Sequence, residues 1–155
     1  AHAGYNESMT IFDVLCYAKE NCRLSGRFVP VNQLKGIVQA SSVGEPLFKE
    51  AAGRFDHRTE LLAGACELLG GSPEPVGDVS YRLPVFDFLP VILQFWNSDE
   101  EFGPVLKLMW DENILSYMHY ETTWFAAAHL WDRLAGLMEQ IGKEGFHGQQ
   151  RGTVF

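Results

Sequence analysis

Two apolar segments separated by a short acidic loop constrain the fold more than any other part of this sequence. In the segment Leu89–Trp96 every second residue is a large apolar one, namely Leu89, Val91, Leu93 and Phe95. A period of two is typical of a β-strand with two different faces. Val105–Trp110 is another such segment, and the eight residues from Asn97 to Pro104 suffice to join the two as a hairpin with an acidic tip. The sequence therefore predicts an antiparallel sheet.

Further strands and a set of helices are indicated around this hairpin. Val79–Leu83 is predicted to be a strand and Tyr117–Tyr120 a short additional one. Helical spacing and capping residues predict helices from Ser8 to about Cys22, from Pro46 to Ala52, from a capping Asp56 to Leu69, and from Thr122 or Thr123 to about Ile141. The last of these carries one apolar stripe, made of Trp124, Ala127, Ala128, Trp131, Leu134, Ala135 and Met138, and is expected to lie on the sheet.

These elements predict a single α+β domain in which an antiparallel sheet of three to four strands is covered by helices. A chain of 155 residues has the size of one domain. We expect residues 1–7 to be a disordered or truncated leader, residues 8–141 to form the domain, and residues 142–155 to be a flexible tail. The stretch from Ser72 to Asp78 is expected to be a surface connection, because its prolines and glycine suit neither a helix nor a central strand.

The charge and the cysteine content narrow the class of partner and the compartment. The net charge is −8, with no cluster of basic residues, so nucleic acid and anionic membranes are not expected as partners. The longest apolar run, Val85 to Trp96, is too short to cross a membrane. Cys16, Cys22 and Cys66 form no C-x-x-C pair, which favours a reducing cytoplasm over a disulfide framework. Cys22 and Cys66 are expected to be small buried hydrophobes.

Four short segments resemble a family of prokaryotic domains. They are Leu24–Val31, Cys66–Gly71, Phe95–Phe102 and Leu108–Asp111, and their order resembles the domain-of-unknown-function family 3786 over about Thr10 to Leu137. Its most specific element is Phe-Trp, an acidic run, Phe, and then Trp-Asp. The resemblance implies an anaerobic prokaryote as the source and work near redox or corrinoid metabolism, since some members carry an adjacent iron-sulfur domain. It implies no catalytic residue, and the cofactor stays unknown.

A possible metal or acid-base site lies just before the last predicted helix. His119 and Glu121 are two residues apart, which on an extended segment would place both side chains on one face, and Asp111 is a third candidate ligand. The alternative is that His119 caps the sheet edge while Glu121 lies at the helix N-terminus, where the helix dipole stabilises a carboxylate. The acidic run Asp99–Glu101 is expected to be a solvated hairpin tip, since adjacent acids point apart.

Aromatic residues are concentrated between Trp96 and Trp124 and suggest a pocket for a flat ligand. The candidates are Trp96, Phe102, Trp110, Tyr117, Tyr120 and Trp124. The alternative is that most of them form the core between the sheet and the last helix. His129 and the nearby Arg133 are expected on the polar, solvated face of that helix.

Three functions follow as hypotheses. The first is a non-enzymatic cytoplasmic module that binds a small molecule or a protein partner in anaerobic metabolism. The second is a metal-dependent enzyme that uses His119 and Glu121. The third is a homodimer that pairs through an edge strand or an aromatic patch and is chiefly structural.

Overall fold

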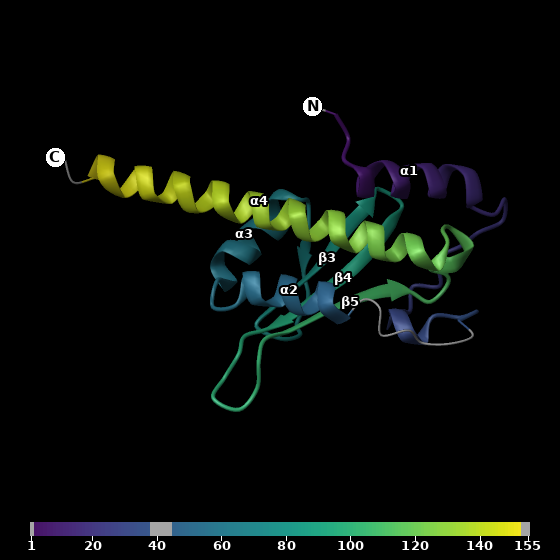
Figure 1. Ribbon diagram of the computed structural model, residues 1–155, viewed down its shortest axis with the longest axis horizontal. Helices are drawn as coiled ribbons and strands as arrows, with labels where there is room; N and C mark the ends of the chain where they lie inside the picture. The colour runs from purple at the N-terminus through teal and green to yellow at the C-terminus, as the bar shows by residue number, and fades with distance from the viewer. Residues whose placement is uncertain (1, 38–44, 153–155) are drawn as a thin grey trace.

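The computed structural model describes residues 2–37 and 45–152, with the side chains of the last helix described as far as Glu144. Figure 1 shows one α+β domain in which a long helix crosses a twisted sheet. The helices are α1 (Tyr5–Tyr17), α2 (Glu45–Phe55), α3 (Thr59–Leu68) and α4 (Tyr120–Gly152). The strands are β1 (Phe28–Pro30), β2 (Ser72–Pro73), β3 (Val79–Phe86), β4 (Leu89–Trp96) and β5 (Val105–Asp111), and the 3-10 turns are η1 (Val31–Gln33) and η3 (Ile114–Ser116).

The sheet is antiparallel and has five strands in the order β1-β5-β4-β3-β2. The predicted fold class is confirmed, and the strand number is higher than the three to four expected. The two additional strands lie at the edges, where three residues ending in Pro30 and two ending in Pro73 are enough to pair. Such short, proline-containing segments have no visible period of two, so the sequence pattern could not reveal them.

The central hairpin was predicted correctly, whereas the expected strand at Tyr117–Tyr120 is wrong. β4 has the predicted bounds, and β5 extends one residue further, to Asp111. Ile114–Ser116 instead forms a 3-10 turn, after which α4 begins at Tyr120. The apolar residues Tyr117 and Met118 are buried in this connection, so their burial does not need strand pairing.

The two faces of the sheet differ, and we name them the covered face and the open face. Leu89, Val91, Leu93 and Phe95 of β4 point to the helices and are 0% exposed. Their neighbours in register on β3 and β5, such as Leu83 and Trp110, are buried with them. The open face points away from the helices and consists of Phe28, Pro30, Ser80, Arg82, Ile92, Gln94, Trp96, Val105, Lys107, Met109 and Asp111, of which Ser80 and Asp111 are buried.

The first helix differs from its prediction in both bounds and orientation. α1 begins at Tyr5 rather than Ser8, so residues 5–7 of the expected leader are helical, and it ends at Tyr17, before Cys22. Thr10 and Val14 form its buried side, whereas Leu15, which helical spacing grouped with Ile11, Val14 and Ala18, is 79% exposed. The helix lies along α4 (Figure 1), and this contact selects a narrower buried side than the apolar spacing suggested.

The other helices follow the predictions more closely. α2 and α3 occur where expected, but Asp56 does not cap α3, because its carboxylate binds Ser98 at the start of the β4–β5 loop. α4 starts before Thr122 and continues to Gly152, past the predicted end at Ile141. Its buried stripe includes Ala127, Trp131, Leu134 and Met138, as predicted. No helix within the described ranges combines the length and hydropathy needed to cross a membrane.

Candidate functional site

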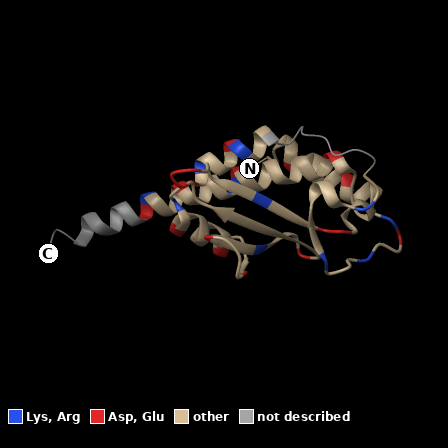
Figure 2. Cartoon of the chain, turned by 90° about the horizontal axis from the view of Figure 1, so that it is seen from below, with Lys and Arg blue, Asp and Glu red and all other residues tan. Residues whose placement is uncertain are grey.

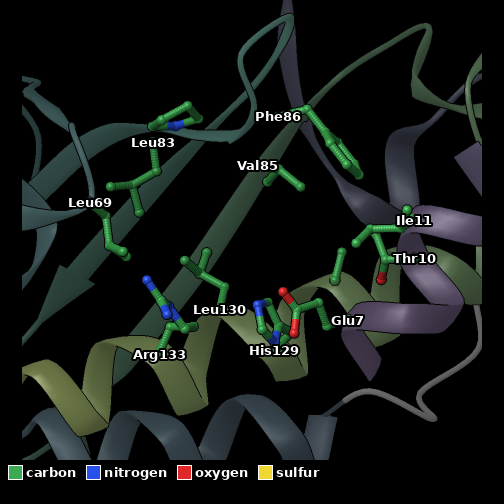
Figure 3. A pocket seen from close by; sticks show the side chains of 12 residues that line it. Glu7, Thr10, Ile11, Leu69, Leu83, Val85, Phe86, His129, Leu130 and Arg133 are labelled. Carbon is green, nitrogen blue, oxygen red and sulfur yellow. The ribbon is translucent and has the colours of Figure 1, made fainter. Parts of the chain in front are cut away.

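A cavity of about 290 Å³ lies between α1, α4, the end of α3 and the end of β3. Figure 3 shows side chains from these elements around a common space. At roughly 30 Å³ for each water molecule, the cavity has room for about ten. Its walls are mostly apolar and come from Ile11, Leu69, Leu83, Pro84, Val85, Phe86, Ala126 and Leu130.

β3 changes course at its last residues, beside the cavity. The register with β4 shifts between Pro84 and Phe86, so the strand leaves its regular alternation there. Val85 and Phe86 are both half-buried, and both line the cavity. An uninterrupted strand would have directed these consecutive side chains to opposite faces. The irregularity therefore adds a second apolar residue to the wall.

Three ionisable side chains complete the lining, namely Glu7 from α1 and His129 and Arg133 from α4. His129 and Arg133 are four residues apart and so share one side of the helix. Figure 3 shows Glu7 beside His129, with Arg133 further along α4. Within the described parts of the chain, the side chains of these three residues have no hydrogen bond or ion pair to protein groups. The cavity thus presents donors and an acceptor beside apolar walls.

A hydroxyl group also lines the cavity but is already engaged. Thr10 Oγ1 donates to the Asn6 carbonyl of its own helix at 2.7 Å. This bond satisfies the hydroxyl within α1. Thr10 therefore contributes shape and a buried methyl group rather than a poised nucleophile.

A separate polar cluster joins the C-terminal half of α1 to the start of α4. Asp13 accepts hydrogen bonds from the His119 backbone N–H at 2.8 Å, from the Thr122 hydroxyl at 2.6 Å, and contacts His119 Nδ1 at 2.7 Å. Asp13 is thus a capping residue for α4 that comes from another helix. Burial alone would raise the pKa of Asp13, but the hydrogen bonds from Thr122 and His119 outweigh it and hold that pKa below 3.8.

The three predicted metal ligands have different surroundings and different partners. His119 binds Asp13 and stacks on Tyr17 with ring centroids 3.7 Å apart. Asp111 is 1% exposed and accepts N–H groups of Ser25, Gly26 and Asn113. In the part of the chain that the structure describes, no group of three or more His, Cys, Asp and Glu side chains is arranged to hold a metal ion.

The position of Glu121 agrees with the alternative proposed for it. Glu121 is exposed in the first turn of α4, where the helix dipole favours a carboxylate. Ligation by a smaller set that includes His119 stays a prediction.

The six predicted pocket aromatics are distributed over several parts of the fold. Trp110 and Tyr117 belong to the core, Phe102 is 67% exposed at the tip of the β4–β5 loop, and Trp96 lies on the open face. Tyr120 and Trp124 pack edge to face on α4, with ring centroids 5.9 Å apart. Trp96 and Trp110 face opposite sides of the sheet, so they make no cross-strand cluster. None of the six lines either cavity described here, and ligand binding by them stays a prediction.

A third polar cluster holds the start of the β4–β5 loop. Ser98 Oγ donates to Asp56 Oδ2 at 2.6 Å and lies 3.1 Å from His57 Nε2. A serine-protease triad places its carboxylate on the far nitrogen of the histidine. Here the carboxylate binds the hydroxyl itself, and the pKa of Asp56 is lowered by these hydrogen bonds from Ser98. The cluster is therefore an anchor between the α2–α3 corner and the loop.

A smaller cavity of about 200 Å³ lies between α2 and α4. Arg54 lines it and is already paired with Glu50 at 3.8 Å and with Asp132 at 3.5 Å. The indole of Trp131 also lines it and packs edge to face on Phe48. Because its charged groups are engaged with one another, this cavity is a weaker site for a ligand than the one beside α1.

Sequence reasoning did not predict the cavity residues and missed Asp13. His129 was expected to be a solvated surface residue, but it is half-buried and lines the larger cavity. The spacing of His129 and Arg133 on one side of α4 was the available signal. No sequence signal indicates that α1 would lie opposite them, because that contact depends on tertiary packing.

Comparisons with known proteins identify the family of the chain. The search of curated proteins found no match. The search of solved structures likewise found none. A family model described as "Domain of unknown function (DUF3786)" matches residues 2–133, in agreement with the resemblance seen in the sequence. Because this match spans well over half of the chain, the protein belongs to the DUF3786 family.

Proposed function

We propose that this domain is a non-enzymatic binding module for a small organic molecule that carries a carboxylate beside an apolar portion. The observation that carries the proposal is the cavity of about 290 Å³ between α1, β3 and α4, with apolar walls and three ionisable groups that have no partner among the described residues. Ligand sites are typically concave and apolar with a few placed polar groups, and the cavity lies at the lower end of their usual volumes.

The charges in the cavity support an anionic group on the ligand. A guanidinium presents two parallel N–H donors that match a carboxylate, and Arg133 has no competing protein carboxylate among the described contacts. His129, one turn before Arg133, adds a second potential donor. Glu7 faces them from α1 and suits a donor on the ligand, such as a hydroxyl or an amine. The apolar portion would lie against Leu83, Val85 and Phe86.

A cytoplasmic location belongs to the same proposal. Cys16, Cys22 and Cys66 are all free thiols, which suits a reducing compartment. Burial raises the pKa of Cys66 to about 12, with the adjacent Glu67 adding to the effect, so this thiol is unreactive at neutral pH. The anaerobic setting comes from the family resemblance alone.

An NMR titration with three probes of equal chain length tests the proposal. The probes are hexanoate, pentylamine and pentanol, which share a five-carbon alkyl portion and differ only in the polar group. We expect hexanoate to shift the amide signals of α1 and α4 around the cavity and to bind more tightly than the other two. Arg133→Gln should weaken hexanoate binding about tenfold, the loss expected for one charge-assisted hydrogen-bond pair.

Lys143→Gln provides the matched control, since Lys143 is a basic, exposed residue of α4 that does not line the cavity. It should leave hexanoate binding unchanged. Native mass spectrometry of protein purified without oxygen would complement the titration by revealing a co-purified organic mass. The proposal fails if hexanoate shows no saturable binding, or if it binds Arg133→Gln as tightly as the unmodified chain.

A further inference from the structure

The open face of the sheet combines apolar side chains with two cations. Phe28, Ile92, Trp96 and Met109 are only partly buried there, and Figure 2 shows the strands almost entirely free of acidic residues. Arg82 lies over the Phe28 ring at 4.9 Å, and Lys107 lies over the Trp96 ring at 5.1 Å. Arg82 is also paired with Glu74 at 3.0 Å, so Lys107 is the cation of this face that has no carboxylate partner among the described residues.

Another segment of the same chain carries negative charge. The loop between β4 and β5 projects away from the body of the domain (Figure 1). Its tip presents Asp99, Glu100 and Glu101 together with Phe102, which is 67% exposed. Acidic charge next to one exposed aromatic ring complements a surface of cations and apolar side chains. We name residues 99–102 the loop tip.

The loop tip is held in one conformation. Asp99 Oδ1 accepts the backbone N–H groups of Glu101 at 2.9 Å and of Phe102 at 2.7 Å, and the Asp99 N–H donates to the Phe102 carbonyl at 2.9 Å. These bonds close the tip into a tight turn. An ordered recognition element loses less conformational entropy on binding than a flexible one.

The start of the loop is fixed as well, at the expense of backbone strain. Ser98 binds Asp56, and Asn97 Oδ1 accepts the His57 backbone N–H at 2.8 Å. His57 adopts φ of 54°, in the left-handed region that non-glycine residues rarely occupy. Asp78 accepts the Asn97 N–H from a third segment at 2.7 Å. The loop is therefore presented to solvent from a rigid base.

The edges of the sheet offer no comparable route to association. β1 ends in Pro30 and β2 ends in Pro73, and both are very short. A proline lacks the backbone donor that a paired strand needs, and short edges limit the number of new hydrogen bonds. Pairing through an edge strand, one form of the dimer hypothesis, is thereby disfavoured.

We propose that two copies of this chain associate by docking the loop tip of one copy on the open face of the other. Phe102 would rest among Ile92, Trp96 and Met109, and the acids of the tip would lie near Lys107. Each copy offers both surfaces, so a twofold arrangement satisfies both contacts at once. The occupant is a second copy because its own tip carries the complementary charge and the exposed aromatic ring.

Sedimentation equilibrium from low to high micromolar protein tests the association. We expect a reversible dimer, and Phe102→Ser should raise its dissociation constant about tenfold or more, as for an aromatic anchor. The matched control is Phe12→Ser on α1, because Phe12 is 64% exposed and belongs to neither surface. It should leave the dissociation constant unchanged. Both positions are exposed, so both variants should keep the wild-type circular dichroism spectrum.

A charge exchange identifies the two surfaces as each other's partners. Lys107→Glu and Glu101→Lys should each weaken self-association, because each brings like charges together in the dimer. An equimolar mixture of the two variants should recover it, since one contact of the mixed dimer is wild type and the other has both charges reversed. The proposal is overturned by a wild-type chain that is monomeric throughout, by a dimer insensitive to Phe102→Ser, or by a mixture that does not recover.

Discussion

The covered and open faces of the sheet are built from the same strands, yet they have different energetics. On the covered face, Leu93 and Phe95 are fully enclosed by helices. On the open face, Ile92 and Trp96 retain contact with solvent and lie beside cations. The strict alternation along β4 separates the two roles residue by residue. The covered face therefore contributes more to stability, whereas the open face stays in contact with solvent.

The largest expected effect comes from truncating matched residues on the two faces. Leu93→Ala should lower the free energy of unfolding by about 2–5 kcal/mol, because it removes buried contacts and leaves a cavity. Ile92→Ala, one residue earlier on the open face, should cost less than about 1.5 kcal/mol. Urea unfolding of both variants measures the difference. Equal losses would show that the open face is enclosed as firmly as the covered one.

The next largest loss of stability is expected at Gly77, in the turn that contacts Trp96 on the open face. Gly77 has φ of 73°, and a Cβ there would lie 2.6 Å from the Phe95 carbonyl oxygen and 3.1 Å from Trp96 Cε2. Gly77→Ala should therefore cost about 1–3 kcal/mol in strain and displaced backbone. Gly26→Ala is the control, with φ of 78° and no atom within 4 Å of the added Cβ.

Gly26→Ala carries the left-handed strain without the steric clash, so its loss in thermal unfolding should be the smaller of the two. A Gly77→Ala variant as stable as Gly26→Ala would mean that Phe95 and Trp96 can move away from the added Cβ without a loss of stability. The open side of β4 would then tolerate the extra atom.

A smaller effect is expected in the helical layer of the covered face. Asp13→Asn should cost about 0.5–2 kcal/mol at neutral pH, as for other lost helix caps. The pKa of Asp13 is lower in the folded chain than its ordinary 3.8, so its contribution is complete above that value and is lost as the pH falls through the folded pKa. Urea unfolding at pH 7 and below pH 4 should show the gap between the two proteins narrowing in acid.

Asp99→Asn tests the same linkage at a second site: the pKa of Asp99 is also lowered, by the backbone N–H groups of Phe102 and Glu101, so the gap between this variant and the wild type should also narrow in acid. Its carboxylate orders the exposed loop tip and not the helical layer. A gap for Asp13→Asn that stays constant from neutral to acidic pH would contradict the capping role.

The smallest effect belongs to the cations of the open face. Lys107→Gln removes the ammonium group over Trp96, a contact worth about 0.5–1 kcal/mol at an exposed site. The free energy of unfolding should change by no more than that, while the tryptophan fluorescence should shift. A loss as large as that of Leu93→Ala would assign the open face a stabilising role and remove the distinction between the faces.

The sequence predicted the parts of the fold that depend on local pattern. The alternation in β4 correctly predicted its bounds and both of its faces, and the stripe around Trp131 predicted the buried side of α4. The edge strands β1 and β2 were missed because pairing with β5 and β3 creates them. For the same reason, the helical spacing that grouped Val14 with Ile11 and Leu15 could not reveal that Thr10 faces the interior and Leu15 the solvent.

The candidate site was less predictable than the fold. The cavity combines Glu7 of α1 with His129 of α4, residues that are adjacent only after the helices pack. His119 was singled out as a candidate ligand beside Glu121, whereas its observed partner is Asp13. In both cases the partner is more than a hundred positions away along the chain, and no local spacing encodes such a pair.

The place of β1 in the sheet has a consequence for the order of folding. β3, β4 and β5 follow one another along the chain, whereas Phe28 of β1 must meet Asp111 of β5 after most of the chain has intervened. Closing so long a loop costs entropy that the neighbouring hairpins do not bear. We expect β1 to join a preformed sheet late and to exchange its amide hydrogens first. Phe28 would then be the last aromatic residue to reach its position on the open face during folding.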